Sequence, residues 1–199
     1  MSQKEIDRYI TLNELAGQNG IVILGGTDDK NIPLCELKQA FDLNPKLYNR
    51  SISELSIDDA FKIYDMLIAP LNPETVLLHI GMADIMTFTK NPSDFDQKYR
   101  RLINHIKAQN YRCRIAVISL KNPSADNNIS ELNRHLKYIA ESEQCEYGDI
   151  TSKRVWNPKE TKNVVSFIHS MGFINSLTAK RPLYDLVKIL YCYEPCYAN

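Results

Sequence analysis

The stretch that decides the fold is Ile21–Asp29, with the sequence IVILGGTDD. Four aliphatic residues run into two glycines, and this short, β-branched run predicts a strand over 20–25 that is buried on both faces. The paired glycines let the chain turn sharply and bring its backbone close to a neighbour or a ligand. In an open α/β sheet, ligands bind at the carboxyl ends of the strands. We therefore expect Thr27 to lie near the functional site.

The rest of the chain alternates between apolar runs and amphipathic segments. Further strands are expected at 47–52, 74–80, 114–120 and 145–150. Helices are expected at 3–17, 33–41, 56–72, 91–106 and 129–140, and from about residues 171 and 182, with Ser56 and Asn91 as N-caps. Strands alternating with helices of this length indicate right-handed βαβ units. The prediction is a single α/β domain over 1–199, a three-layer α/β/α sandwich whose mainly parallel sheet has about five strands.

Composition excludes several classes of protein. The 199 residues are 44% hydrophobic, which suits a globular domain with a sizeable core. The formal net charge of +0 gives no electrostatic case for nucleic acid or a membrane surface as partner. The start, MSQKEIDRYI, lacks the apolar stretch of a signal peptide, and no later run is long enough to span a bilayer. We expect a cytoplasmic protein.

The cysteines also favour a cytoplasmic protein. Their number, five, is odd and there is no CxxC pair, so reduced thiols are the simplest interpretation. Cys192 and Cys196 are close enough to pair or bind a metal, but no further Cys or His stands at ligand spacing. We predict no metal and no cofactor.

Four blocks of sequence match, in order and spacing, the blocks of a known family. They are Gly25-Gly26-Thr27, Asn49-Arg50-Ser51-Ile52-Ser53-Glu54, Gly81-Met82-Ala83-Asp84 and Ser166-Phe167-Ile168-His169. Over roughly residues 20–190 the chain resembles the SGNH (GDSL) hydrolases, esterases and acyl-hydrolases of flavodoxin-like architecture. The family's blocks read GDS, N-x-G-x-x-G, G-x-N-D and D-x-x-H. The resemblance implies the same fold and a site at the strand ends.

The resemblance also assigns a role to each position. The family's serine attacks an acyl carbonyl, and an aspartate-oriented histidine removes the serine proton. Backbone N–H groups at the serine and the second-block glycine, with the third-block asparagine, hold the oxyanion. Here the nucleophile is Thr27, the second-block glycine is Ser51, the asparagine is Ala83 and the aspartate is Ser166, so that only His169 keeps its type.

These replacements predict a poor enzyme. Loss of one oxyanion donor, as at Ala83, costs about 3–4 kcal/mol of transition-state stabilisation. Loss of the acid, as at Ser166, costs on the order of 10⁴-fold in rate. The methyl group of Thr27 restricts its rotamer and crowds the attack. We therefore expect a pseudoenzyme, a binding or scaffolding module whose crevice takes a small acyl or carbohydrate ligand, or a protein partner, at Gly26, Asp28 and Asp84.

Two other hypotheses remain open. In the first, an active acyl-ester hydrolase uses Thr27 as nucleophile and His169 as base, with Asp28, Asp29 or Asp149 as the substitute acid. In the second, Asp28, Asp29 and Asp84 bind Mg²⁺ in a phosphoryl-transfer or receiver-like domain, although the chain has no phosphate loop.

Several of these residues also have a purely structural interpretation. Thr27 can cap the following helix, and Asp84 can bond loop backbone. His79 is expected to be a satisfied core histidine, and His105 and His135 to lie on helices away from the strand ends. The C-terminal YCYEPCYAN covers either a partner surface or a sheet edge.

Overall fold

The computed structural model describes residues 3–122, 124–151 and 180–191. The chain divides into two compact units, one of residues 1–31 and 45–151, the other of residues 32–44 and 152–199. Each is described by itself. The expected single domain stays a prediction, and the expected helix from about residue 171, like Ser166 and His169, lies outside the described residues.

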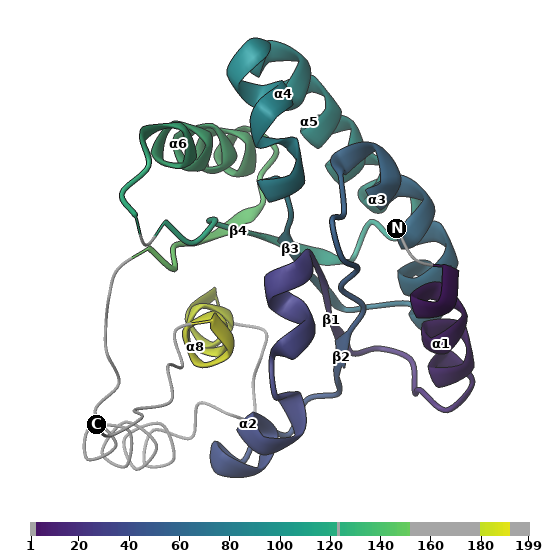
Figure 1. The fold of residues 1–199 in the computed structure, drawn as a ribbon. Helices are drawn as coiled ribbons and strands as arrows, with labels where there is room; N and C mark the ends of the chain where they lie inside the picture. Colours follow the sequence, from purple (N-terminus) through teal and green to yellow (C-terminus); the bar gives the residue numbers. More distant parts are fainter. Residues whose placement is uncertain (1–2, 123, 152–179, 192–199) are drawn as a thin grey trace. The chain divides into compact units, whose positions relative to one another are not determined.

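The first unit contains a parallel five-stranded sheet in the order β2-β1-β3-β4-β5 (Figure 1). The strands are β1 (Ile21–Gly25), β2 (Leu47–Asn49), β3 (Thr75–His79), β4 (Arg114–Ile118) and β5 (Glu146–Gly148). Every pair runs parallel, and Gly25 lies in register with His79 at the carboxyl ends of β1 and β3. All five predicted strands are confirmed, with β2 and β5 shorter than expected.

Except for α4, the helices of this unit lie within or close to the predicted spans. They are α1 (Gln3–Glu14), α3 (Ile57–Ile63), α4 (Ile85–Lys90), α5 (Pro92–Gln109) and α6 (Asn127–Ser142), with 3₁₀ turns η1 (Thr27–Asn31) and η4 (Met82–Asp84). After α3 the chain continues as the π-helical η2 (Tyr64–Ile68) and the 3₁₀ turn η3 (Ala69–Leu71). The side chains of Ser56 and Asn91 accept the N–H groups of Asp59 and Asp94, so both predicted N-caps are confirmed. Helix α4 was not predicted.

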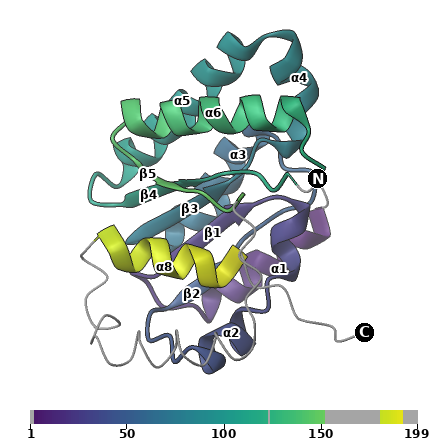
Figure 2. The same ribbon diagram turned by 90° about the vertical axis from the view of Figure 1, so that its left-hand side faces the viewer.

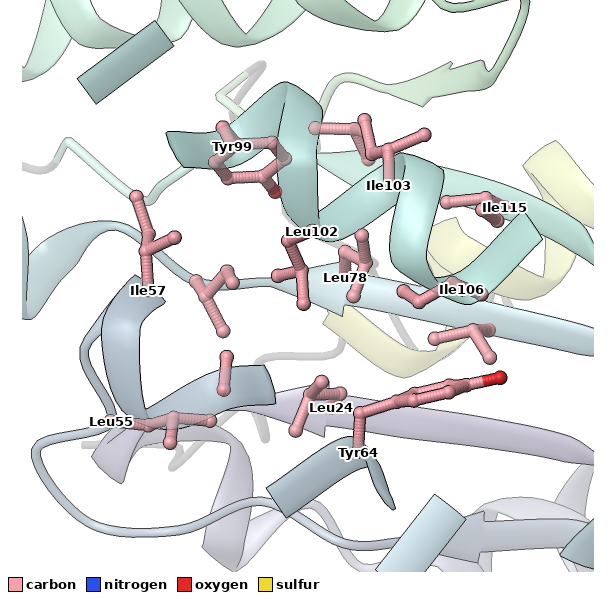
Figure 3. Packing of buried hydrophobic residues seen from close by; sticks show 14 of the residues in the cluster. Leu24, Leu55, Ile57, Tyr64, Leu78, Tyr99, Leu102, Ile103, Ile106 and Ile115 are labelled. Atoms are coloured by element: carbon pink, nitrogen blue, oxygen red, sulfur yellow. The ribbon is translucent and has the colours of Figure 1, made fainter. Parts of the chain in front are cut away.

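Helices α1, α3, α5 and α6 share one face of the sheet. Alternate strand residues, such as Leu24, Leu78 and Ile115, join the buried cluster that these helices complete. Figure 3 shows Leu102 and Ile106 of α5 packed over these strands, and Figure 2 shows α5 and α6 side by side. All five residues of β1 are buried, as predicted for the IVILG strand.

The second unit contributes two described helices, α2 (Leu34–Ala40) and α8 (Lys180–Tyr191), which contact each other. Leu37 of α2 and Leu183 and Leu186 of α8 are buried. Helix α2 lies within the predicted span 33–41, and α8 begins two residues before the predicted start at residue 182. Among the described residues, no helix is both long and apolar enough to cross a membrane.

Candidate functional site

The carboxyl ends of β1, β3 and β4 surround a pocket of about 260 Å³ within the first unit. Its walls are Gly26, Thr27, Asp28, Asp29, Glu54, Leu55, His79, Ile80, Gly81, Met82, Ala83, Leu120 and Lys121. The pocket therefore brings together the first and third sequence blocks, as the resemblance implied. Of the other predicted site residues, Ser51 and Asp84 lie outside the pocket wall.

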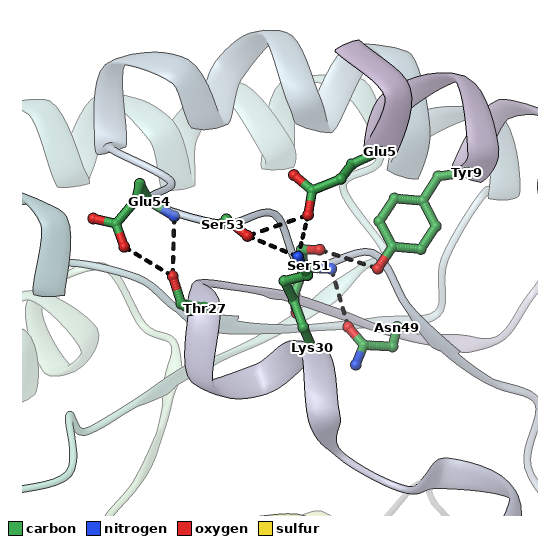
Figure 4. Close-up of polar contacts among 8 residues, drawn as sticks. All are labelled: Glu5, Tyr9, Thr27, Lys30, Asn49, Ser51, Ser53 and Glu54. Carbon is green, nitrogen blue, oxygen red and sulfur yellow. Dashed lines mark hydrogen bonds and ion pairs between the residues drawn. The ribbon is translucent and has the colours of Figure 1, made fainter. Parts of the chain in front are cut away.

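Thr27, the residue at the nucleophile position, is exposed at the start of η1. Its Oγ1 donates to Glu54 Oε1 at 3.0 Å and accepts from the Glu54 N–H at 3.1 Å (Figure 4). A hydroxyl has a single proton to donate. Because that proton goes to Glu54, the hydroxyl is paired with an acid of the second block.

Glu54 occupies the place of the second glycine in the family's N-x-G-x-x-G block. Its φ of 53° lies in the left-handed region, which costs a residue with a Cβ roughly 1–2 kcal/mol. The backbone at residue 54 thus has a conformation that suits glycine, although the residue is a glutamate. The carboxylate at this position is what reaches Thr27.

Ser51, at the first glycine of that block, is fully buried and has an ordinary negative φ. Its N–H, the expected oxyanion donor, donates to Asn49 Oδ1 at 3.0 Å (Figure 4). Its carbonyl accepts from Tyr9 Oη at 3.1 Å. The conformation therefore accommodates a Cβ, but the N–H group is already used inside the protein.

Arg50 holds the same loop against α1. Its guanidinium lies over the rings of Tyr9 and Tyr48, at 5.2 and 5.5 Å from their centroids. It also donates to Asn13 Oδ1 at 2.8 Å and to the Asn49 carbonyl at 2.9 Å. Burial lowers the pKa of this arginine. These contacts leave the second-block loop little freedom to move toward the pocket.

Ala83 presents only a methyl group where the family has an asparagine amide, so its side chain supplies no hydrogen bond to a ligand. The next residue, Asp84, turns away to accept the Ile57 N–H at 3.1 Å, at the first turn of α3. Burial raises the pKa of Asp84 to about 6, and this backbone hydrogen bond opposes the rise. Asp84 thus has the structural role that the sequence analysis allowed for, rather than a place in the binding wall.

An acid–histidine pair at the edge of the pocket was missed. Asp29 Oδ1 lies 2.7 Å from His79 Nδ1, and the two side chains are 2% and 5% exposed. The other carboxylate oxygen accepts the Gly26 N–H at 2.9 Å. A Cβ at Gly25 would come within 1.9 Å of Asp29 Oδ2, whereas one at Gly26 would meet open space. Gly25 is therefore the glycine that a close approach requires, and the group that approaches is a carboxylate.

Sequence contained a signal for this pair. A histidine in the otherwise apolar ETVLLHI run ends β3, and an aspartate follows the neighbouring strand. The carboxyl ends of adjacent parallel strands meet at one edge, which brings these two residues together. The expectation that His79 is a satisfied histidine agrees with the Asp29 contact, but its position at the pocket was not foreseen.

The pairing also bears on the acids proposed to orient His169. Asp29 is held by His79 and Gly26, and Asp149 accepts the N–H and the hydroxyl of Thr151 at 2.8 and 2.6 Å. Of the three candidates, Asp28 lines the pocket and has no such hydrogen bond to another described residue.

The magnesium hypothesis required Asp28, Asp29 and Asp84 around one ion, yet Asp84 faces the first turn of α3 and Asp29 is bonded to His79. Within residues 3–122, 124–151 and 180–191, no group of three or more His, Cys, Asp or Glu side chains is placed to hold a metal. His105 and His135 pair with Asp65 and Asp96 on the helices, as expected away from the strand ends.

Comparison with solved structures shows the fold. The chain is similar to a protein assigned as an acylhydrolase from Bacteroides fragilis, with 15% identity, a TM-score of 0.62, and coverage of 86% of this chain and 97% of that one. A GDSL-like lipase from Bacteroides thetaiotaomicron gives 14% identity, a TM-score of 0.58 and coverage of 84% and 96%. A catalytic mutant of an acetylxylan esterase from Geobacillus stearothermophilus gives 14% identity, a TM-score of 0.55, and coverage of 90% of this chain and 97% of that one.

The chain therefore has the α/β/α fold of the SGNH/GDSL hydrolases, and identities this low mark it as divergent in sequence. The sequence itself matches no model of a known protein family. It also matches no curated protein.

Proposed function

We propose that this protein is a non-catalytic binding module that keeps the crevice of an SGNH hydrolase. The observation that carries the proposal is the bond from the Thr27 hydroxyl to Glu54. In a Ser-His-Asp site the nucleophile directs its proton at the histidine of the triad. Here the Thr27 hydroxyl directs its proton at the carboxylate of Glu54, which stands at the second glycine position of the block.

The oxyanion side of the pocket supports the same conclusion. The Ser51 N–H is bonded to Asn49, and the side chain of Ala83 has no donor. A site with these two donors missing stabilises a tetrahedral intermediate poorly, because each preorganised donor in such a site contributes about 3–4 kcal/mol. The two losses are not additive, yet either would leave weak turnover. The retained feature is the pocket, which supports binding.

The test is hydrolysis of a short-chain aryl ester by the intact protein and by Thr27→Ala, Thr27→Ser and His169→Ala. The proposal expects all four proteins to match the background rate. Thr27→Ser is the matched control, since it keeps the hydroxyl and removes only the methyl group that crowds an attack.

Turnover well above background that disappears in both Thr27→Ala and His169→Ala would overturn the proposal. It would establish the alternative, an acyl-ester hydrolase with Thr27 as nucleophile and His169 as base. Asp28 would then be the first acid to replace, because it lies in the pocket.

A further inference from the structure

The pocket described above differs in electrostatic character from a site that stabilises an oxyanion. Three carboxylates, those of Asp28, Asp29 and Glu54, stand in its wall against one lysine, Lys121. The ring of His79 also lines the pocket and is bonded to Asp29. Asp28 and Glu54 are exposed, so their charges face solvent and any bound group.

Neighbouring cations do not cancel these charges. The Lys30 ammonium group follows Asp28 and Asp29 in sequence, but it binds Glu5 and the hydroxyl of Ser53 on the other side of the loop (Figure 4). Lys98 pairs with Asp58 and Asp94 on the helical face. Lys121, at the end of β4, stands two strands away from β1, about 10 Å at the spacing of a parallel sheet.

The hydrogen-bonding groups of the pocket also favour a positively charged ligand over a negatively charged one. Two donors that would meet a negative oxygen are consumed or absent, because the Ser51 N–H is bonded to Asn49 and Ala83 has only a methyl group. The Gly26 N–H is likewise bonded to Asp29. On its β1 side the pocket offers a ligand the carboxylate oxygens of Asp28 and Glu54, which accept hydrogen bonds and attract positive charge.

The remaining wall is aliphatic. Leu55, Ile80, Met82, Ala83 and Leu120 line the pocket, and no Trp, Tyr or Phe of the described chain does so. An aromatic cage is the usual means of binding a quaternary ammonium group. Its absence from this wall, with carboxylates available as acceptors, favours a primary ammonium group that can donate hydrogen bonds. The volume of about 260 Å³ lies below the roughly 300–1,000 Å³ of pockets for drug-sized ligands.

We propose that the pocket binds a small primary amine, with the ammonium group held by Asp28 and Glu54 and a short aliphatic body against Met82 and Leu120. The inference rests on the proposed function, since it names the ligand class of the same non-catalytic pocket. It replaces the acyl or carbohydrate ligand that the family resemblance implied.

The experiment is an NMR titration of the isotope-labelled protein with n-butylammonium, and in parallel with butyrate, tetramethylammonium and xylose. Butylammonium is expected to shift the amide signals of the 25–29 and 79–83 segments, and the other three probes to bind more weakly or not at all. Added salt is expected to weaken butylammonium binding, because the charges at this open site are screened.

Substitutions test the residues. Glu54→Gln and Asp28→Asn each remove one charge at nearly constant shape, and Glu54→Gln keeps an oxygen that accepts from Thr27. Each is expected to weaken butylammonium binding about tenfold, the loss that follows from one charge-assisted hydrogen bond. Lys121→Met is expected to strengthen binding. Glu74→Gln, an exposed acid at the opposite end of β3, is the matched control and is expected to change nothing.

Three results would overturn the inference: no binding of butylammonium, butyrate binding as tightly as butylammonium, or unchanged affinity in both acid variants. The ester assay on the same preparation separates the two proposals. Turnover that depends on Thr27 overturns the proposed function, whichever probe binds. If the protein hydrolyses no ester and binds no butylammonium, only the proposed ligand class is overturned.

Discussion

Glu54 offers the sharpest test of how the pocket is built, because its backbone conformation lowers the stability of the fold and its side chain raises it. Its φ of 53° costs a residue with a Cβ roughly 1–2 kcal/mol. Its carboxylate accepts the Thr27 hydroxyl, which is worth about 1 kcal/mol. Glu54→Ala should lose the hydrogen bond and keep the strain. Glu54→Gly should lose the same bond and relieve the strain, at an entropic cost of about 0.5–1 kcal/mol in the unfolded chain.

The expected order of stability follows from these terms. Glu54→Ala should be about 1 kcal/mol less stable than the intact protein. Glu54→Gly should lie between that variant and the intact protein, and Glu54→Gln should stay within about 0.5 kcal/mol of the intact protein, because its amide oxygen also accepts.

The assay is urea unfolding followed by far-ultraviolet circular dichroism, comparing transition midpoints at unchanged slope. A Glu54→Ala variant as stable as or more stable than Glu54→Gly would refute the reasoning, because residue 54 would then not be held in the left-handed region. If Glu54→Gln is instead as unstable as Glu54→Ala, a neutral oxygen that accepts from Thr27 is not enough. The negative charge of Glu54 is then the stabilising feature.

Three further predictions concern groups around the site. Gly25→Ala should cost about 1–3 kcal/mol, because its Cβ displaces the Asp29 carboxylate, and the added cost should shrink when Asp29→Ala is already present; additive losses in urea unfolding would contradict this. The pKa of Asp84 rises from an ordinary value near 3.8 to about 6, so the folded protein holds this proton more tightly than the unfolded chain. Its contribution to stability is therefore complete below about pH 4 and lost as the pH rises through 6, and Asp84→Asn should flatten that part of the stability profile measured by chemical unfolding. Burial raises the pKa of the Cys113 thiol to about 12, so mass spectrometry after native-state labelling at pH 8 should find Cys113 unmodified and exposed Cys35 modified; equal labelling would contradict the burial.

Most of the sheet could be predicted because its strands are encoded locally. The runs that became β1, β3 and β4 are continuous and apolar, which is typical of strands buried in a parallel sheet. The N-caps at Ser56 and Asn91 depend on residues only three positions away, so they too were visible in the sequence. Helix α4 was not, because Ile85–Lys90 is short and has one buried residue, Phe88, and so no periodic stripe to detect.

The site was predicted in position but not in its bonding. The four blocks located Thr27 and Ala83, and the structure places both in one pocket. The partner of Thr27 is 27 residues away, and Asp29 and His79 are separated by 50 residues. Such pairs depend on which strands are neighbours and on how each loop turns, and a periodicity along the chain contains neither. The sequence analysis assigned Glu54 no role, although its side chain supplies the bond that holds Thr27.

Under the proposed function, the pattern of replacements gives a physical reason why the fold stays intact without the catalytic set. An active site keeps a polarised nucleophile and preorganised donors ready for a transition state, and it sacrifices stability to do so. In this pocket those groups have found partners within the protein: Thr27 is bonded to Glu54, and the Ser51 N–H to Asn49. Each bond satisfies a polar group that catalysis would need to have available. It follows that Ala83→Asn and Ser166→Asp alone should not produce hydrolysis, because the Thr27 hydroxyl would remain paired with Glu54. Recovery would also require Glu54→Gly and Thr27→Ser, and an ester assay of the double and quadruple variants would separate missing groups from groups that are present but already bonded.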